Sequence, residues 1–197
     1  MYRKNLFNKS KYLLNQKFIS NVKDKTPTQI LYKFPNDELF MKFIAEDKVS
    51  HLFQYVIVYE NKEVLLNLVF GKKYNSEWKI NIIQFGQLSL FARNAQDYFE
   101  IAQQNYNTNH LVDALFNIEF AKLCSNPATT YGILKSTESI NNLYSKITST
   151  FKKNYTFPIV FSQIKSNPKI VKVYPDIYSN NFYTRIDYLT KIKIDNR

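Results

Sequence analysis

The stretch FQYVIVYENKEVLLNLVF, residues 53–70, decides the fold of this chain. Two runs rich in β-branched and aromatic residues flank a short polar segment, which is typical of an antiparallel β-hairpin. Side chains alternate between the two sides of a strand, so each run carries one apolar face. These faces consist of Phe53, Tyr55, Ile57 and Tyr59 in the first run, and of Val64, Leu66, Leu68 and Phe70 in the second.

The turn of this hairpin is predicted at Asn61-Lys62. A two-residue turn there pairs Tyr59 with Val64 and puts both apolar faces on the same side of the sheet. A slip of one residue would send one of the faces to the opposite side. Asn tolerates the positive φ that tight hairpin turns need, which favours this position for the turn.

A third strand follows in EWKINIIQF, residues 77–85. The alternation of its side chains adds Trp78, Ile80 and Ile82 to the apolar face of the hairpin. The other side is mixed, with Lys79, Asn81, Ile83 and Phe85. A sheet with one apolar face needs a second layer over that face, so we expect helices to cover it.

The next segment, AQDYFEIAQQNYNTNHLVDALFNIEFAKLCSNP at residues 95–127, changes to a helical period. It predicts two helices joined near residues 107–109, and the small side chains of Ala102, Ala114 and Ala121 let the helices approach closely. Apolar residues spaced three and four apart predict further helices over residues 4–22, 36–48 and 129–152. Strands are predicted over residues 157–164, 169–175 and 182–194.

The predicted fold class is α+β: an antiparallel sheet packed against N-terminal helices, then a helical hairpin and a long helix, then C-terminal β-strands. Residues 1–90 are expected to form the sheet-bearing domain, residues 91–153 a helical segment and residues 154–197 a small β segment. These parts can pack as one unit, since 197 residues are enough to bury a proper core.

Composition excludes several kinds of site. The chain has only three glycines, Gly71, Gly86 and Gly132, and it contains no glycine-rich phosphate loop and no nucleophile elbow. The single cysteine, Cys124, forms no intramolecular disulfide, and we interpret it as a small buried side chain on a helix. We predict no cofactor.

The net charge of +11 is unevenly distributed. Residues 1–33 carry net +7, residues 34–134 net −3 and residues 135–197 net +7. Most of the positive charge is lysine, whereas specific phosphate or base recognition favours arginine, so we disfavour nucleic acid as a partner. No apolar run reaches the length of about 18 residues that a membrane-spanning helix needs.

The order of helices and long strands ending in Trp78-Lys79-Ile80 resembles the cone-shaped α+β fold of the nuclear-transport-factor-two-like superfamily. This resemblance covers roughly residues 3–90. The helical pair resembles a single tetratricopeptide-type unit, with Pro127 one position beyond the proline of that motif.

The patterns AxDYFxxA and DALxxxExA followed by Asn126-Pro127 are similar to uncharacterised secreted or lipid-anchored proteins of Bacteroidetes-type bacteria. That resemblance implies an extracytoplasmic or lipid-anchored protein. The chain begins with neither a signal peptide nor a lipid-accepting cysteine, and a true start at Met1 would instead imply the cytoplasm.

Enzymes of the cone-shaped superfamily place an Asp–His or Asp–Tyr pair inside the cone. The corresponding strands here offer Tyr55, Tyr59 and Asn67, with no acid or histidine on the apolar face. His110 and Asp113 could share a helix face, but two ligands do not make a metal site, and a capping role for Asn109 is the alternative. We therefore predict no catalytic and no metal-ligating residue.

A candidate pocket remains on the apolar side of the sheet. Aromatic side chains with polar tips suit a small apolar ligand or a peptide, and the same side chains suit an ordinary core. The first hypothesis is a non-enzymatic binding or scaffolding protein that docks an unknown protein partner or self-associates. The alternatives are a small-molecule-binding protein or an isomerase- or dehydratase-like enzyme, and a nucleic-acid-associated protein with lysine-rich ends. The candidate pocket residues are Tyr55, Tyr59, Leu68, Trp78, Phe40 and Phe43.

Overall fold

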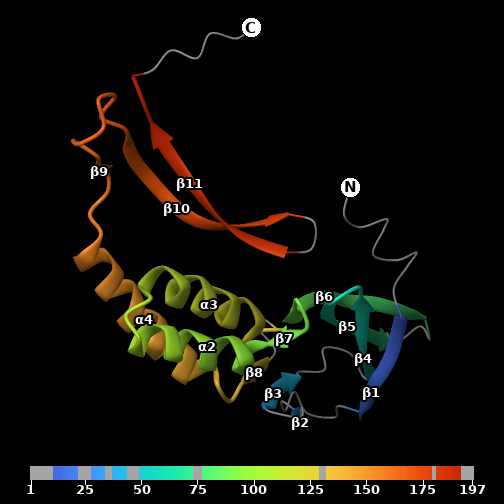
Figure 1. Ribbon diagram of the computed structural model, residues 1–197. Coiled ribbons are helices and arrows are strands. Elements are labelled where there is room, and N and C mark those ends of the chain that lie inside the picture. Colours follow the sequence, from blue (N-terminus) through green and yellow to red (C-terminus); the bar gives the residue numbers. More distant parts are fainter. Residues whose placement is uncertain are drawn as a thin grey trace, which may run out of the picture.

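The computed structural model describes residues 11–21, 28–33, 37–43, 49–72, 77–128, 132–178 and 181–191. The fold class is α+β, as the sequence predicts: a curled antiparallel sheet, three helices and C-terminal strands. Figure 1 shows the helices at one end of the molecule and the large sheet at the other, with the C-terminal strands extending above the helices.

The large sheet has five strands in the order β1-β4-β5-β6-β7, and all neighbours are antiparallel. Bulges interrupt the register between β1 and β4 and twice between β5 and β6, and a bulge increases the local twist of a strand. The strands are β1 (Lys11–Asn21), β4 (Val49–Tyr59), β5 (Lys62–Lys72), β6 (Trp78–Leu90) and β7 (Arg93–Asn94).

Three helices follow the sheet along the chain. Helices α2 (Ala95–Asn107) and α3 (Leu111–Cys124) form the expected helical hairpin, and α4 (Thr137–Asn154) is the expected long helix. Helix α2 begins with a capping box, in which the Asn94 side chain accepts from the backbone of Asp97 while the Asp97 carboxylate accepts from the backbone of Asn94.

A second, small sheet has the order β2-β3-β8, with β2 (Thr28–Lys33), β3 (Glu38–Phe43) and β8 (Gly132–Leu134). Two predicted helices, over residues 4–22 and 36–48, are therefore wrong within the described residues, because nearly all described residues of these ranges lie in β1 and β3. Leu39 and Met41 of β3 are buried and Phe40 is exposed, which is the period of a strand. Ladder pairing with β4 likewise overrides the helical spacing of β1.

The predicted hairpin exists, but its turn lies one residue earlier. The central turn residues are Glu60 and Asn61, so Tyr59 pairs with Lys62 and Tyr55 with Leu66. Glu60 takes a positive φ of 53°. The pairing is thus shifted by two residues, an even number, and the two apolar faces still share one side of the sheet.

The turn makes a contact that is distant in sequence. The backbone carbonyl of Asn61 accepts a 2.7 Å hydrogen bond from Ala92, in the turn between β6 and β7. Phe91 and Ala92 both have positive φ, 52° and 58°, as a type I′ hairpin turn requires. Two neighbouring turns are therefore tied together at this end of the sheet.

The helices do not cover the face that the sequence suggests. The main core draws on the opposite side of the sheet, through Leu52 of β4 and Leu65 and Val69 of β5. That side also buries two amides, Gln54 and Asn67, which read as surface residues in the sequence. Gln54 Nε2 donates to Asn67 Oδ1 at 2.9 Å, so the pair is buried at a reduced cost.

A bulge also rearranges β6. Val69 pairs with Ile82 and Phe70 with Ile80, so Asn81 is the extra residue of the bulge. Trp78 and Ile80 therefore lie on one side together with Ile83 and Phe85, whereas Ile82 faces the core. The predicted separation of Trp78 from Ile83 is wrong because strict alternation ends at a bulge.

The loop after α3 packs directly on the core side of β6. A Cβ added at Gly86 would lie 1.8 Å from the backbone oxygen of Pro127. The Gln84 side chain donates to the backbone oxygen of Ala128 two strand positions away. A glycine inside a strand often marks such a close approach of another backbone segment.

Helices α2, α3 and α4 share one core with the sheet. Ala102, Ala114 and Ala121 are fully buried, as expected for a close helical pair. Tyr98 is also buried, and its hydroxyl donates to the Leu90 carbonyl at 2.7 Å. Cys124 is a free, buried thiol, which confirms its interpretation as a core side chain.

Alkaline pH is expected to destabilise this core. Burial raises the pKa of Tyr98 to about 12, with a further contribution from the Cys124 charge, and burial raises the pKa of Cys124 to about 12. The folded protein thus keeps both protons at pH values where the unfolded chain releases them. Their stabilisation is complete below about pH 9 and is lost as pH rises toward about 12.

The measurement is the urea midpoint of unfolding at a series of alkaline pH values. We expect it to fall steadily from about pH 9 upward, and to fall less steeply in Tyr98→Phe. Native Cys124 should also react with a thiol reagent much more slowly than unfolded protein does. A midpoint that stays constant to about pH 11 would contradict the burial of both groups.

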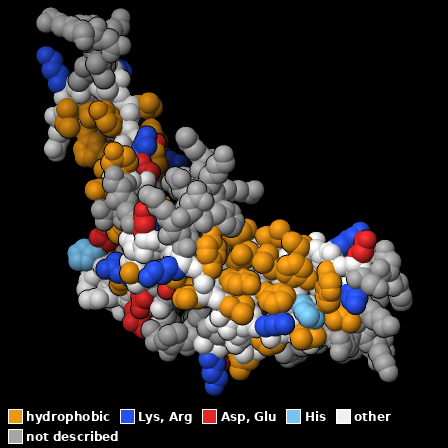
Figure 2. All heavy atoms as spheres, turned by 90° about the vertical axis from the view of Figure 1, so that its right-hand side faces the viewer, with side chains coloured by type: hydrophobic (Ala, Val, Ile, Leu, Met, Phe, Trp, Pro, Cys, Tyr) orange, Lys and Arg blue, Asp and Glu red, His pale blue; other side chains and the backbone are white. Residues whose placement is uncertain are grey.

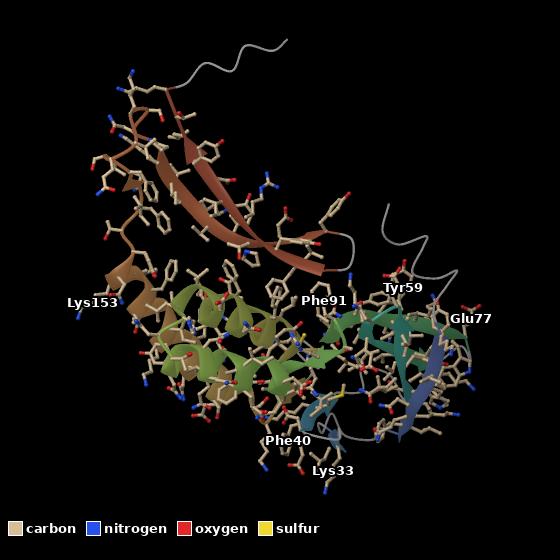
Figure 3. The ribbon with its side chains drawn as sticks, in the orientation of Figure 1. Lys33, Phe40, Tyr59, Glu77, Phe91 and Lys153 are labelled. Atoms are coloured by element: carbon tan, nitrogen blue, oxygen red, sulfur yellow. The ribbon has the colours of Figure 1, made fainter. Side chains whose placement is uncertain are left out.

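The C-terminal strands form a three-stranded sheet, built around the β10–β11 hairpin, that extends above α3 (Figure 1). It comprises β9 (Ile159–Val160), β10 (Lys169–Tyr178) and β11 (Asn181–Leu189) in the order β11-β10-β9. Phe182 joins it to the body, with its ring centroid 5.4 Å from that of Phe120 and 6.3 Å from that of Phe91. Figure 3 shows Phe91 beneath the hairpin, where helices and sheet meet.

Removing this anchor should loosen the hairpin alone. In Phe182→Ala we expect faster backbone hydrogen exchange in β10 and β11, while the exchange of α2 and α3 changes little, because each lost aromatic pair contributes about 1 kcal/mol. Tyr183→Ala is the matched control, since Tyr183 is 53% exposed and points to the other side of β11. Equal exchange in the two variants would contradict docking through Phe182.

Candidate functional site

The side of the five-stranded sheet turned away from the core is the candidate site, and we call it the outer face. It is largely apolar. Figure 2 shows hydrophobic side chains gathered over a broad area on the side of the molecule that carries this sheet. By register the outer face comprises Tyr12, Leu14, Lys17 and Ile19 of β1, Val49, His51, Phe53, Tyr55, Ile57 and Tyr59 of β4, Lys62, Val64, Leu66, Leu68, Phe70 and Lys72 of β5, and Trp78, Ile80, Ile83, Phe85 and Gln87 of β6.

Exposure across the outer face is graded. Its apolar side chains in the flanking strands β1 and β6 expose between 42% and 58% of their surface. In the central strands Ile57 is fully buried, Leu66 is 7% exposed, and Phe53 and Tyr55 are half-buried. None of these side chains belongs to the main core among the described residues.

Aromatic contacts hold the end of the outer face near Trp78. The rings of His51 and Trp78 lie 4.7 Å apart, and Phe53 meets Phe70 edge-on with centroids 5.6 Å apart. These rings come from three neighbouring strands, since His51 pairs with Phe70 and Phe70 with Ile80. Such tilted and edge-to-face contacts fix side-chain orientation before any ligand arrives.

Two lysines of the outer face lie over its rings. Lys17 Nζ is 5.3 Å from the centroid of Phe53, and Lys72 Nζ is 5.9 Å from that of Trp78. Both distances are within the range of a cation–π attraction. The lysine stems therefore cover apolar surface while the ammonium groups stay at its edge.

The structure brings together four of the six predicted pocket residues. Tyr55, Tyr59, Leu68 and Trp78 share the outer face. Phe40 belongs to the small sheet, is 50% exposed, and lies far from Tyr59 in Figure 3. The side chain of Phe43 lies outside the described residues.

The other candidate residues, which lie around the start of α3, are not arranged as a metal site. His110 is the N-cap residue of α3 and its ring contacts Thr108 Oγ1 at 3.0 Å, so the predicted cap at Asn109 is wrong. Asn109 instead takes a positive φ in the turn between the helices. Across the described part of the chain, no cluster of three or more His, Cys, Asp or Glu side chains is placed to hold a metal ion.

Among the helices that the structure describes, none combines the length and the apolar character needed to cross a bilayer.

Comparison of the chain with protein families, curated proteins and solved structures finds no match. The resemblances to the cone-shaped superfamily and to a tetratricopeptide unit therefore stay predictions.

Sequence reasoning missed several outer-face residues. Tyr12, Leu14 and Ile19 were assigned to a helix, and Ile83 and Phe85 to the opposite side of β6. The bulge in β1 changes which side chains share a face, from Tyr12 and Leu14 before it to Lys17 and Ile19 after it. Nothing in the sequence marks the position of this bulge. Two amides, Gln54 of β4 and Asn67 of β5, could have indicated the correct register. They lie opposite each other only in the observed pairing of the strands.

Proposed function

We propose that this chain is a non-enzymatic binding or scaffolding protein, and that its outer face is the docking surface for a partner. The observation that carries the proposal is the large apolar area left outside the core. Exposed apolar side chains in β1 and β6 flank half-buried aromatic residues of β4 and β5. Monomeric proteins rarely expose contiguous apolar patches of this kind unless the patch binds something.

The composition of the outer face supports binding over chemistry. Its polar groups are three lysines, one histidine, the Gln87 amide and the tyrosine hydroxyls, with no paired acid and base among the described positions. Aromatic and aliphatic side chains that expel water, with a few charges at the edge, are typical of the centre and rim of a protein interface. A small-molecule site and a nucleic-acid site remain alternatives that no observed arrangement favours.

Site-specific photo-crosslinking in cells tests the proposal. A benzophenone amino acid at Ile83 samples the outer face, and the same amino acid at Ile133 is the matched control. The two isoleucines are 58% and 57% exposed, and Ile133 lies on the small sheet. We expect a discrete crosslinked partner from position 83 only.

Two further variants make the result decisive. Ile80→Glu should abolish the crosslink from position 83, because a buried carboxylate in an apolar interface costs several kcal/mol unless it is paired. Ile133→Glu should leave it unchanged. The proposal is refuted if positions 83 and 133 give the same crosslinks, or if Ile80→Glu keeps them while the variant stays folded.

A further inference from the structure

The charges on the outer face have one sign. Lys17 and Lys72 place their ammonium groups over its rings, and His51 and, by register, Lys62 are further basic side chains. The described positions of the outer face include no Asp and no Glu, and the nearby Glu77 precedes β6 rather than standing on the face. A partner that covers the aromatic rings therefore meets positive charge at Lys17 and at Lys72.

The distribution of exposed side chains suggests an elongated occupant. Leu14 and Ile19 stand exposed along one edge and Ile80 and Ile83 along the other, with the more buried strands β4 and β5 between them. Strands β4 and β5 have 11 residues each, which corresponds to about 36 Å. A helix of about 24 residues, or a shorter extended segment, spans that length.

From these two observations we propose that the partner of the outer face is an amphipathic protein segment with an apolar stripe and acidic flanks. This inference rests on the proposed function and specifies its partner. The stripe packs between the two exposed edges, and Asp or Glu side chains beside it pair with Lys17 and Lys72. Complementary charge of this kind steers association and selects against wrong partners.

Other occupants fit less well. A second copy of the chain docking face to face would bring its own lysines against these lysines, with no carboxylate on the face to pair them. Nucleic-acid bases need free aromatic faces, whereas Phe53 and Trp78 already have lysines over their rings. The most exposed positions of the outer face are aliphatic, and aliphatic side chains offer bases nothing to stack on.

Trp78 provides a direct readout, because it is the only tryptophan and it lies on the outer face. The full chain is titrated with two synthetic helical peptides of about 18 residues, or five turns. Both carry the same leucine stripe, and one has glutamates and the other lysines on its polar side. The same fluorescence titration is run with phosphatidylcholine–phosphatidylglycerol vesicles and with a single-stranded oligothymidine.

We expect the glutamate peptide to shift Trp78 emission and to bind at least about tenfold more tightly than the lysine peptide, with the difference shrinking at high salt. The double variant Lys17→Glu, Lys72→Glu should reverse the preference. Its control is Lys152→Glu, Lys153→Glu, which makes the same change in net charge. Figure 3 shows Lys153 at the far end of α4, away from the sheet.

Equal binding of both peptides, or no binding of either, would overturn the inference. A Trp78 shift with vesicles or oligothymidine alone would overturn it in favour of a lipid surface or a nucleic acid. Crosslinks from position 83 that persist while the glutamate peptide fails would leave the proposed function standing without its acidic partner. If the crosslink from position 83 and the binding of the glutamate peptide are both absent, the proposed function and its acidic partner are refuted together.

Discussion

Replacing Gly86 by alanine is expected to lower the free energy of unfolding by at least about 3 kcal/mol, or to abolish cooperative folding. The added Cβ would lie 1.8 Å from the Pro127 oxygen and 2.5 Å from its Cα, both of them backbone atoms. Backbone atoms cannot rotate away as a side chain can, so β6 or the loop after α3 has to move. Urea unfolding followed by circular dichroism measures the loss.

Gly132→Ala is the matched control, because its Cβ would meet the flexible Met41 side chain first, at 2.7 Å from Cγ. We expect a loss of about 1 kcal/mol there. Changing an unhindered strand glycine to alanine should raise the free energy of unfolding by about 0.5–1 kcal/mol. The sign of the change in Gly86→Ala is therefore informative. A Gly86→Ala variant as stable as the parent would contradict the packing of the Pro127 loop on the sheet.

Asn67→Leu carries the second largest expected effect, a loss of about 2–3 kcal/mol. Asn67 is 2% exposed and joins two other amides: its Oδ1 accepts from Gln54 Nε2 at 2.9 Å and its Nδ2 faces Gln84 Oε1 at 3.4 Å. Leucine fills a similar volume but forms no hydrogen bond with Gln54 or Gln84. The cost comes from the lost hydrogen bonds of the Gln54 Nε2 and Gln84 Oε1 atoms inside the protein, while Gln54 keeps its contact with Met41 and Gln84 its bond to Ala128. Urea unfolding measures this cost.

The double variant Gln54→Leu, Asn67→Leu separates this cause from a packing defect. Removing both partners of the 2.9 Å bond leaves no orphaned donor between them, so we expect the double variant to lose less than the sum of the two single variants by about 1 kcal/mol or more. Strictly additive losses would show that the amide pair contributes nothing beyond its volume.

The sequence predicted the class of the fold and most of its element order, because these depend on local patterns. The helical pair and the long helix follow from apolar spacing and small residues such as Ala102 and Ala114, which the structure buries completely. The shared face of the hairpin strands was also predicted correctly, since an even shift in register preserves it.

The side of the sheet that faces the core could not be predicted from hydrophobicity. The outer face is the more apolar of the two, and the core side contains Gln54, Asn67 and Gln84. These amides are tolerated inside because they bond to each other and to the loop at Ala128, and that network exists only in the folded chain. The bulges and the paired turns at Asn61 and Ala92 are likewise tertiary features without a local signature.

The same reversal explains how far the candidate site could be predicted. Tyr55, Tyr59, Leu68 and Trp78 lie on one side of the sheet, as the alternation of side chains predicts. That side was expected to lie beneath a layer of helices, and the structure leaves it outside the main core. The four residues that were predicted to line a pocket are therefore now proposed to form part of a docking surface.

Acrylamide quenching of Trp78 fluorescence in the isolated protein tests the central claim, an outer face open to solvent, most directly. Trp78 is 46% exposed and is the only tryptophan, so the signal comes from the outer face alone. We expect solvent-exposed emission and efficient quenching that decreases when the crosslinked partner is bound. Blue-shifted emission that resists quenching in the isolated protein would mean that the outer face is already covered, which would contradict its role as a docking surface.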